Sequence, residues 1–162
     1  MERSRIEDLV ATFPRRCRDK GLHLTPQRAA IYEALASSPT HPSAERIHEL
    51  LAAKLPSLSL ATVYKTLETF REVGLIELLN VVHETARYDA ETTEHHHLIC
   101  ERCKTVEDVY DPALDALNAR GARKHGFSIR RRSVHFYGLC ADCSRTERPA
   151  PGTPKPTTPR RS

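Results

Sequence analysis

Apolar residues recur at nearly helical spacing over the first 80 residues of the chain, and this pattern predicts four helices. Pro14 lies inside the first of them, so we expect that helix to kink or to be interrupted there. The apolar positions of the first predicted helix are Ile6, Leu9, Val10, Phe13 and Cys17.

Each of the other three predicted helices begins at a residue that favours the N-cap position. Thr25 stands before Pro26, and proline is well suited to the first turn of a helix. Ser43 precedes the third helix and Ser59 precedes the fourth. The fourth helix is predicted to end at Gly74, because glycine readily adopts the left-handed conformation found after helix C-termini.

Two short segments with strand character follow the fourth predicted helix. Residues 75–79 and 87–89 are predicted strands of the right length for a two-stranded wing. Three compact helices, the last facing outward, followed by a β-hairpin make a winged helix-turn-helix. We therefore predict a DNA-binding domain over residues 1–84.

The last helix of such a domain enters the major groove, so its outward side chains matter most. They offer hydroxyl groups and one cation, which suit contacts with phosphates and base edges. A separate basic cluster ahead of the helices is a candidate for contacts with the DNA backbone or minor groove. An ordinary solvated polar face is the alternative for these side chains. The outward positions are Ala61, Thr62, Tyr64, Lys65, Thr66 and Thr69, and the basic cluster is Arg15, Arg16, Arg18 and Lys20.

The rest of the chain differs from the helical first part in its pattern and composition. Residues 81–144 read as strands around one helix, and we assign residues 85–144 to a second, small α/β domain, so the predicted fold class is α+β. Residues 145–162 contain five prolines and no large apolar residue, so they cannot bury enough surface to offset the entropy of ordering. We predict a disordered tail rich in proline and arginine.

Charge and composition set limits on the function. The formal net charge is +4, and the tail alone carries five basic residues against one acidic residue, so the remaining body sums to zero. Any DNA-binding surface must therefore rest on local charge placement. No apolar run is long enough to span a bilayer, and the first residues do not resemble a secretory signal. We expect a cytoplasmic protein without a membrane partner.

Four of the five cysteines form two Cys-x-x-Cys pairs, separated by 36 residues. Each pair can direct two thiolates at one ion from a tight turn, and two pairs complete a tetrahedral Zn²⁺ site with bonds of about 2.3 Å. A redox-active dithiol is the alternative, but that motif begins an apolar helix, which neither pair is predicted to do. The predicted zinc ligands are Cys100, Cys103, Cys140 and Cys143. The fifth cysteine, Cys17, is expected to be a small buried residue.

A histidine-rich segment leads directly into the first cysteine pair. If it is a strand, His95 and His97 lie on one face and His96 on the other. Carboxylates that stand near it in sequence include Asp89, Glu107 and Asp108, and a mixed nitrogen and oxygen site suits Fe²⁺, Mn²⁺ or Zn²⁺. A surface histidine cluster without a metal is the alternative on spacing alone.

Taken in order, these motifs resemble the ferric uptake regulator (Fur) family of bacterial metal-dependent repressors, over residues 15 to about 146. The motifs that carry the resemblance are Leu24-Thr25-Pro26-Gln27-Arg28, Leu60-Ala61-Thr62-Val63-Tyr64-Lys65-Thr66-Leu67 and His95-His96-His97-Leu98-Ile99-Cys100, together with the two cysteine pairs. The resemblance implies a homodimer whose second domain is the dimerisation domain. It also adds His41, in the loop between the second and third helices, as a metal ligand that spacing alone does not reveal. The residues expected to contact DNA are Arg15, Arg16, Arg28, Ser59, Ala61, Thr62, Tyr64 and Lys65.

Within that family the chain is most similar to the peroxide-sensing (PerR) branch. The regulatory ligands implied for Fe²⁺ or Mn²⁺ are His41, Asp89, His95, His97 and Asp108. The position of Asp108 separates the peroxide-sensing branch from the iron-uptake repressors, which carry glutamate there. A glutamate is also present in this chain at the neighbouring position, Glu107. An additional site of the iron repressors would use positions held by Glu94, His96, Asp115 and Arg132, and we do not expect it because arginine cannot ligate a cation.

The resemblance implies a transcriptional repressor, not an enzyme, that binds a double-stranded operator with an inverted repeat and senses hydrogen peroxide. The first alternative is an iron, zinc or manganese uptake repressor of the same family. The alternative from another class is a zinc-containing thiol oxidoreductase. The sequence shows no catalytic acid, base and substrate pocket for it.

Overall fold

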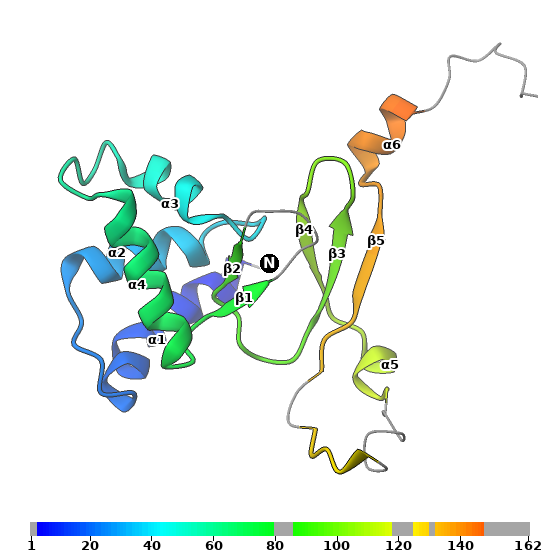
Figure 1. Ribbon diagram of the computed structural model, residues 1–162, viewed down its shortest axis with the longest axis horizontal. Helices are drawn as coiled ribbons and strands as arrows, with labels where there is room; N and C mark the ends of the chain where they lie inside the picture. Colours follow the sequence, from blue (N-terminus) through cyan, green and yellow to red (C-terminus); the bar gives the residue numbers. More distant parts are fainter. Residues whose placement is uncertain (1–2, 80–85, 118–124, 130–131, 148–162) are drawn as a thin grey trace, which may run out of the picture.

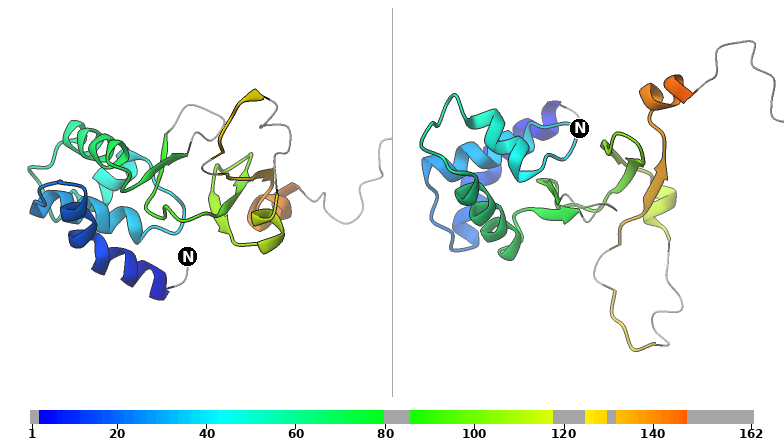
Figure 2. Two further views of the ribbon diagram at one scale, coloured as in Figure 1. Left: turned by 90° about the horizontal axis from the view of Figure 1, so that it is seen from below. Right: turned by 45° about the horizontal axis from the view of Figure 1, so that its top comes forward.

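The computed structural model of the protein describes residues 3–79, 86–117, 125–129 and 132–147. Four helices lie on one side, a three-stranded sheet lies on the other, and a two-stranded wing stands between them (Figure 1). Figure 2 shows the same two-part arrangement from two further directions. Within the described ranges, no helix has the length and apolar character needed to cross a membrane. The helices of the first part are α1 (Arg3–Asp19), α2 (Pro26–Ala36), α3 (Ala44–Leu51) and α4 (Leu60–Glu72).

Helix α1 continues through Pro14, so it is not interrupted there, and the alternative of a kink stays a prediction. Phe13 and Cys17, on either side of this proline, are almost fully buried in the core, whereas Pro14 is exposed. A helix-interior proline removes one backbone hydrogen bond, and here the buried neighbours hold the turn against the other helices. The burial of Cys17 confirms its predicted role as a core residue.

The three predicted N-caps are confirmed. The side chain of Thr25 accepts a hydrogen bond from a backbone N–H in the first turn of α2, and Ser43 and Ser59 do the same for α3 and α4. Gly74 follows α4 with a φ of 70°, a left-handed conformation that suits glycine. Helices α2, α3 and α4 therefore each start where a side-chain oxygen satisfies a free backbone N–H.

Three aromatic rings form the centre of the first core. The rings of Phe13 and Tyr32 are stacked with their centroids 3.7 Å apart. Phe70 meets both of them edge to face. These residues come from α1, α2 and α4, so the three helices share one apolar interior.

The wing consists of β1 (Glu77–Leu79) and β2 (Arg87–Asp89), which pair antiparallel with Leu78 opposite Tyr88. Both predicted strands are confirmed. The predicted domain boundary at residue 84 falls outside the described residues, but Tyr88 and Ala90 belong to the first core. The second wing strand therefore packs on the helices, and the boundary itself stays a prediction.

The second part is built on a sheet with the strand order β4-β3-β5. Its strands are β3 (His96–Cys100), β4 (Val106–Val109) and β5 (His135–Gly138), and its helices are α5 (Pro112–Asp115) and α6 (Ala141–Glu147). Strand β3 pairs antiparallel with β4 and parallel with β5. The sequence predicted one helix here, whereas the described residues form two short ones. Helix α6 includes residues 145–147, which the sequence had placed in the tail; the rest of the predicted tail lies outside the described residues.

The second part has a small core of its own. Leu79, Ile99 and Val106 form its buried apolar cluster. On the sheet, Leu98 is 45% exposed and its cross-strand partner Phe136 is 42% exposed. The described chain therefore leaves an apolar sheet face in contact with solvent.

Candidate metal centres and nucleic-acid interface

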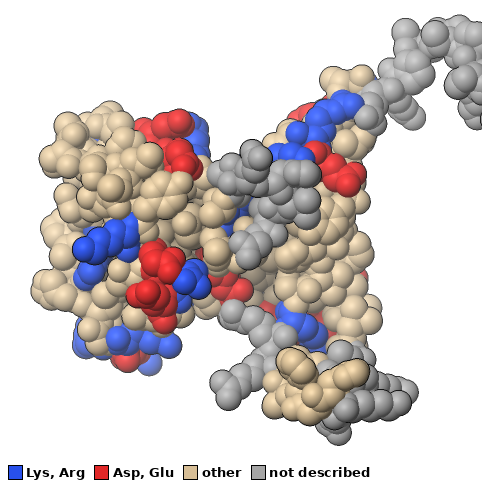
Figure 3. Space-filling model, in the orientation of Figure 1, with Lys and Arg blue, Asp and Glu red and all other residues tan. Residues whose placement is uncertain are grey.

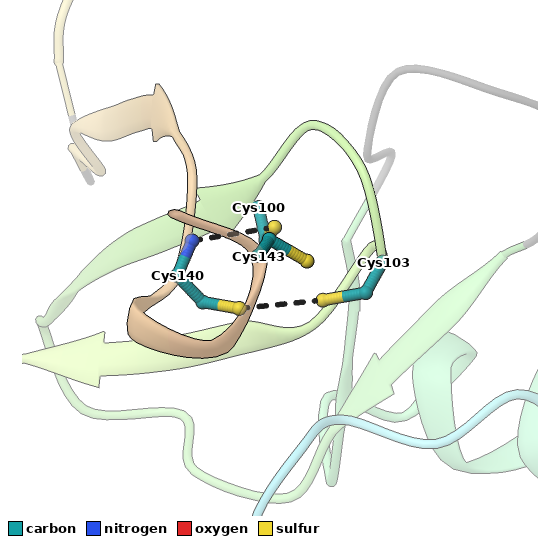
Figure 4. A group of neighbouring side chains, drawn as sticks. All are labelled: Cys100, Cys103, Cys140 and Cys143. Atoms are coloured by element: carbon teal, nitrogen blue, oxygen red, sulfur yellow. Dashed lines mark hydrogen bonds between the residues drawn. The ribbon is translucent and has the colours of Figure 1, made fainter. Parts of the chain in front are cut away.

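The four predicted zinc ligands converge on one point. Their sulfur atoms all lie within 4.8 Å of one another. Cys100 ends β3 and Cys103 lies in the turn that follows, while the second pair lies at the start of α6 (Figure 4). The sulfur atoms of Cys103 and Cys140 are 3.6 Å apart, close to the roughly 3.8 Å between ligands of a tetrahedral zinc with bonds of about 2.3 Å. The sulfur set fits Zn²⁺.

Backbone and hydroxyl groups surround the sulfurs. The backbone N–H of Cys140 donates to the sulfur of Cys100 at 3.4 Å, and backbone N–H groups from Cys140 and Cys103 lower the pKa of Cys100 to about 6. The Thr105 hydroxyl, 3.3 Å away, lowers the pKa of Cys103. Burial and the neighbouring thiols raise the pKa of Cys143 to about 12. Four thiolates so close together therefore need a cation to be deprotonated together.

One structural detail bears on the alternative of a redox dithiol. The Cys140 pair does lie at the beginning of a helix, α6, although the prediction excluded only an apolar helix there. That helix, with the sequence ADCSRTE, is polar, short and largely exposed. Both pairs meet in a single four-sulfur cluster, which is the arrangement of a closed metal site and not of an isolated dithiol.

The five predicted regulatory ligands also converge. One ligand atom from each residue lies within 4.8 Å of the other four. His41 comes from the loop between α2 and α3, and Asp89 ends the wing strand β2. His95 and His97 come from the start of β3, and Asp108 lies opposite His97 on β4. The site therefore lies where the helical part meets the sheet, and it takes ligands from both.

The ligand atoms have the character of a metal site. Among the described residues, the inward atom of each ligand is buried and has no hydrogen-bond partner outside the cluster, where imidazole nitrogens and carboxylate oxygens face one another at 2.9–4.0 Å. These atoms are the Nε2 atoms of His41, His95 and His97, Oδ2 of Asp89 and Oδ1 of Asp108. Buried polar atoms are rarely left unpaired, because each one costs free energy. Nitrogen and carboxylate oxygen donors suit Fe²⁺, Mn²⁺ or Zn²⁺, so the residues fit such a cation.

The outward atom of each ligand does have a partner. His95 Nδ1 lies 2.8 Å from the carbonyl oxygen of Thr93, and Asp89 Oδ1 accepts a hydrogen bond of 2.8 Å from the backbone N–H of Glu91. The other contacts are longer: His41 Nδ1 to the carbonyl oxygen of Val106 (3.3 Å), His97 Nδ1 to Ser133 Oγ (3.4 Å) and Asp108 Oδ2 to the Tyr110 hydroxyl (3.4 Å). Such outer contacts orient ligands and fix the tautomer of each imidazole. None of these outer residues was predicted from the sequence, since tertiary packing alone brings them to the site.

Charge within the cluster is strongly coupled. Burial disfavours the charged imidazole of His41, but the carboxylates of Asp108 and Asp89 outweigh it and raise the pKa of His41 to about 10. Burial also disfavours the charged form of Asp89 and Asp108 and would raise their pKa values. The neighbouring imidazoles outweigh it and hold both pKa values below the usual range. Without a metal, protons on the histidines balance the carboxylates. A divalent cation would replace those protons.

The strand register distinguishes between the two neighbouring acids on β4. Asp108 pairs with His97 and faces the ligand cluster. Glu107 pairs with Leu98, and both are exposed on the opposite side of the sheet. Glu107 therefore does not compete with Asp108 for the site. The histidines alternate in the same way, because His96 points away from the cluster toward Asp115.

The predicted DNA-contacting residues of α4 share one groove with the start of α2. Arg28 and Thr25 on one side and Ala61, Thr62 and Lys65 on the other line it. Charges of both signs alternate over the helical part on the face drawn in Figure 3. Outside the groove, the hydroxyl of Tyr64, which is 41% exposed, donates a hydrogen bond to Glu45. Ser59 serves as the N-cap of α4 and so sets the start of that helix.

Two neighbouring arginines of α1 differ in environment. Arg15 is exposed and lies 3.7 Å from Asp19, an ion pair in water that contributes little. Arg16 turns inward, where its guanidinium donates to the hydroxyl of Tyr32 and the carbonyl oxygen of Leu75. Of this pair, only Arg15 is exposed to solvent, as a phosphate contact requires. The structure therefore gives no support to the prediction that Arg16 contacts DNA.

Comparison with known proteins places the chain among metal-dependent regulators. The profile of the ferric uptake regulator family matches residues 19–137, which is most of the chain. The chain belongs to the ferric uptake regulator family. The peroxide operon regulator of Bacillus subtilis is 39% identical over 130 residues, covering 80% of this chain and 90% of that protein. The members found are regulators and not enzymes, so family membership speaks against the thiol oxidoreductase.

Solved structures of ferric uptake regulators share the fold. The regulator Fur of Helicobacter pylori superposes with a TM-score of 0.70, covering 88% of this chain and 96% of its own, and its 23% identity supports the fold alone. The Francisella tularensis ferric uptake regulator, solved with iron, is 27% identical with a TM-score of 0.64. It covers 76% of this chain and 96% of its own. The predicted α+β fold of two joined units is thereby confirmed.

The additional cation site of iron-repressing family members has a different occupant here. Arg132 Nε lies 2.7 Å from Glu94, and a second nitrogen of the same guanidinium donates to the carbonyl oxygen of Leu117 at 2.8 Å. His96 Nε2 lies 3.1 Å from Asp115. The polar groups at these positions already have partners and a resident positive charge, so the residues do not fit a second regulatory cation.

Proposed function

We propose that this member of the ferric uptake regulator family is a transcriptional repressor that requires a metal and responds to hydrogen peroxide. The observation that carries the proposal is the set of five buried ligand atoms that converge from both parts of the chain. The proposed ligands for Fe²⁺ or Mn²⁺ are His41, Asp89, His95, His97 and Asp108. The proposed structural Zn²⁺ is held by Cys100, Cys103, Cys140 and Cys143.

The position of His41 explains how metal binding would control the domains. Its loop belongs to the helical part, while His95, His97 and Asp108 belong to the sheet. His41 Nε2 lies 2.9 Å from Asp108 and 3.3 Å from Asp89. Coordination through His41 therefore fixes the orientation of the helical part relative to the sheet. A ligand shifts such an equilibrium only by its difference in affinity for the two orientations.

The response to peroxide follows from the imidazole ligands. Fe²⁺ held by these ligands would activate hydrogen peroxide for oxidation of a neighbouring imidazole, whereas Mn²⁺ in the same ligands would react poorly. An imidazole that gains an oxygen atom binds a cation weakly, so oxidation of His41 or His95 releases the helical part from the sheet. The likeness to the peroxide operon regulator of Bacillus subtilis supports this specificity, as does aspartate at position 108.

DNA recognition is proposed for the outer face of α4 and its surroundings. The proposed contacts come from Arg15, Arg28, Ser59, Ala61, Thr62, Tyr64 and Lys65, and we leave out Arg16 because its guanidinium is engaged inside the fold. We further propose a homodimer in the cytoplasm, whose partner covers the apolar sheet face around Leu98 and Phe136. A symmetric dimer binds an operator with an inverted repeat.

The test uses anaerobically purified dimer loaded with Fe²⁺ or Mn²⁺, with operator binding followed by fluorescence anisotropy. We expect both forms to bind the operator, and peroxide to release only the Fe²⁺ form while oxygen is added to His41 or His95. An Fe²⁺ form that keeps both histidines intact and stays bound after peroxide would instead identify a metal-uptake repressor. Equal affinity for operator and random duplex would exclude a repressor of either kind.

A further inference from the structure

Tyr110 lies directly against the regulatory ligand cluster without being one of the ligands. Its ring stacks on the His95 imidazole, with the centroids 5.6 Å apart and the planes inclined by 28°. Its hydroxyl donates a hydrogen bond of 3.4 Å to Oδ2 of Asp108, whose other oxygen faces the cluster. One phenol therefore contacts two of the five ligands, one through its face and one through its oxygen.

The first helix holds this phenol in place. The guanidinium of Arg5, on α1, lies 4.1 Å from the centre of the Tyr110 ring. The same guanidinium is 3.5 Å from the carboxylate of Glu91, which is almost fully buried. Glu91 in turn accepts hydrogen bonds from the backbone and side chain of Thr93. Cation, phenol and imidazole thus form a layered contact from α1 to the metal ligands.

We propose that Tyr110 is a second site of peroxide-driven modification, at which one oxygen atom is added to a ring carbon beside the hydroxyl. The inference rests on the proposed peroxide-sensing function. In the net reaction the O–O bond of hydrogen peroxide and one ring C–H bond break. A C–O–H group forms on the ring, and the second peroxide oxygen leaves as water. Peroxide gains the two electrons that the ring carbon loses.

Oxidation of Tyr110 would compete with oxidation of the histidine ligands. Adding one oxygen to an imidazole ligand also consumes one molecule of peroxide, so Tyr110 and the histidines draw on the same oxidant. An oxidised Tyr110 leaves all five ligands chemically intact, whereas an oxidised His41 or His95 does not. The electron-rich phenol beside His95 therefore lowers the fraction of protein that releases its metal at limiting peroxide.

The experiment treats the full-length Fe²⁺-loaded dimer with limiting peroxide and maps added oxygen by mass spectrometry of its peptides. Tyr64 and Tyr137 serve as internal controls because they are 41% and 47% exposed, close to the 43% of Tyr110. We expect added oxygen on Tyr110 but on neither control, and none on Tyr110 in the Mn²⁺ form. At equal iron loading, Tyr110→Phe should increase the fraction of oxidised His41 and His95.

The outcomes separate this inference from the proposed function. Oxidised histidines beside an unmodified Tyr110 would overturn the inference and leave the peroxide sensor standing. If neither the histidines nor Tyr110 gained oxygen, the proposed function itself would fail. Equal oxidation of all three tyrosines would point to diffusing oxidants and would also overturn the inference, as would unchanged histidine oxidation in Tyr110→Phe.

Discussion

The guanidinium of Arg16 on α1 donates a hydrogen bond of 3.2 Å to the hydroxyl of Thr92 in the segment between the wing and the sheet. The same guanidinium binds the hydroxyl of Tyr32 and the carbonyl oxygen of Leu75. A single side chain therefore connects the first helix, the second helix, the start of the wing and the segment that leads to the metal ligands. Arg16 is part of the framework on which the regulatory site is built.

We predict that Arg16→Ala destabilises the protein by about 2–3 kcal/mol, because it removes charged hydrogen bonds to partly buried acceptors. Arg15→Ala is the matched control, since its side chain is exposed, and it should change stability by no more than about 0.5 kcal/mol. Chemical denaturation of both metal-free variants measures the difference. Equal stabilities would show that the inward contacts of Arg16 contribute nothing.

The same pair should behave in the opposite way toward DNA. Arg15→Ala is expected to weaken binding to operator and random duplex alike and to flatten the salt dependence, because a phosphate contact carries no base information. The measurement is the slope of log affinity against log salt concentration for the metal-loaded dimer. A slope identical to that of the unmodified protein would remove Arg15 from the proposed DNA surface.

Replacing Cys140 by serine should release zinc and weaken the dimer. Removing one ligand from a closed site costs the folding free energy that metal binding contributes. Ser144→Ala, in the same helix α6, changes a nearby exposed hydroxyl without touching a thiolate and serves as the control. Zinc content per chain and sedimentation velocity report the two effects. A Cys140→Ser dimer that kept one tightly bound zinc per chain would contradict the structural assignment.

The stability of the metal-free protein should depend on pH through the regulatory cluster. The carboxylates raise the folded-state pKa of His41 to about 10 from its ordinary 6.5. The stabilisation from this proton is therefore complete below about pH 6.5 and is lost as pH rises toward 10. Asp89 and Asp108 have lowered pKa values, so their contribution is lost as pH falls below their ordinary value near 4. Denaturation across this range should show a maximum between these limits. His41→Ala should reduce the decline on the alkaline side without removing it, because Asp89 outweighs burial and raises the pKa of His95 as well.

Metal binding should show the opposite pH trend. A cation must displace the proton from His41, so its apparent affinity should rise with pH by about tenfold per unit for each proton displaced. Titration of the metal-free protein with Mn²⁺ at several pH values, with proton release followed in weak buffer, measures this. Binding without proton release would show that the histidines are already neutral in the metal-free fold.

The local parts of the fold could be predicted from the sequence because their causes are local. Ser43, Ser59 and Thr25 cap their helices through hydrogen bonds within a single turn. The two cysteine pairs are recognisable from the spacing of their residues in the sequence. Pro14 does not interrupt its helix, because packing of its buried neighbours outweighs one missing hydrogen bond. The domain limits stay a prediction, and the packing of Tyr88 in the first core is a tertiary contact that no local pattern encodes.

The metal site could be predicted only in part. The alternation of His95 and His97 and the position of Asp89 are readable in the sequence, but His41 required a family resemblance because nothing in its loop points to a ligand. The contact between Arg5 of α1 and the Tyr110 ring forms only when α1 packs against the end of the sheet. No sequence pattern encodes a contact between residues so far apart in the chain.

The last prediction concerns the aspartate that faces the cluster from β4. Asp108→Glu adds one methylene, which moves the carboxylate relative to His41 Nε2, now 2.9 Å from it, and changes how tightly the imidazoles surround the ion. We expect the variant to keep metal-dependent operator binding, since five donors of the same types remain, but to lose most of its histidine oxidation at a given peroxide dose. Glu107→Gln is the matched control, because Glu107 faces away from the site beside Leu98 and should leave the response unchanged. Peptide mass spectrometry of His41 and His95 and operator release, followed in parallel on Fe²⁺-loaded protein, provide the two readouts. An Asp108→Glu protein as sensitive as the unmodified chain would show that this carboxylate holds the metal without tuning its reaction, and oxidation confined to the zinc cysteines in both proteins would instead indicate a thiol switch.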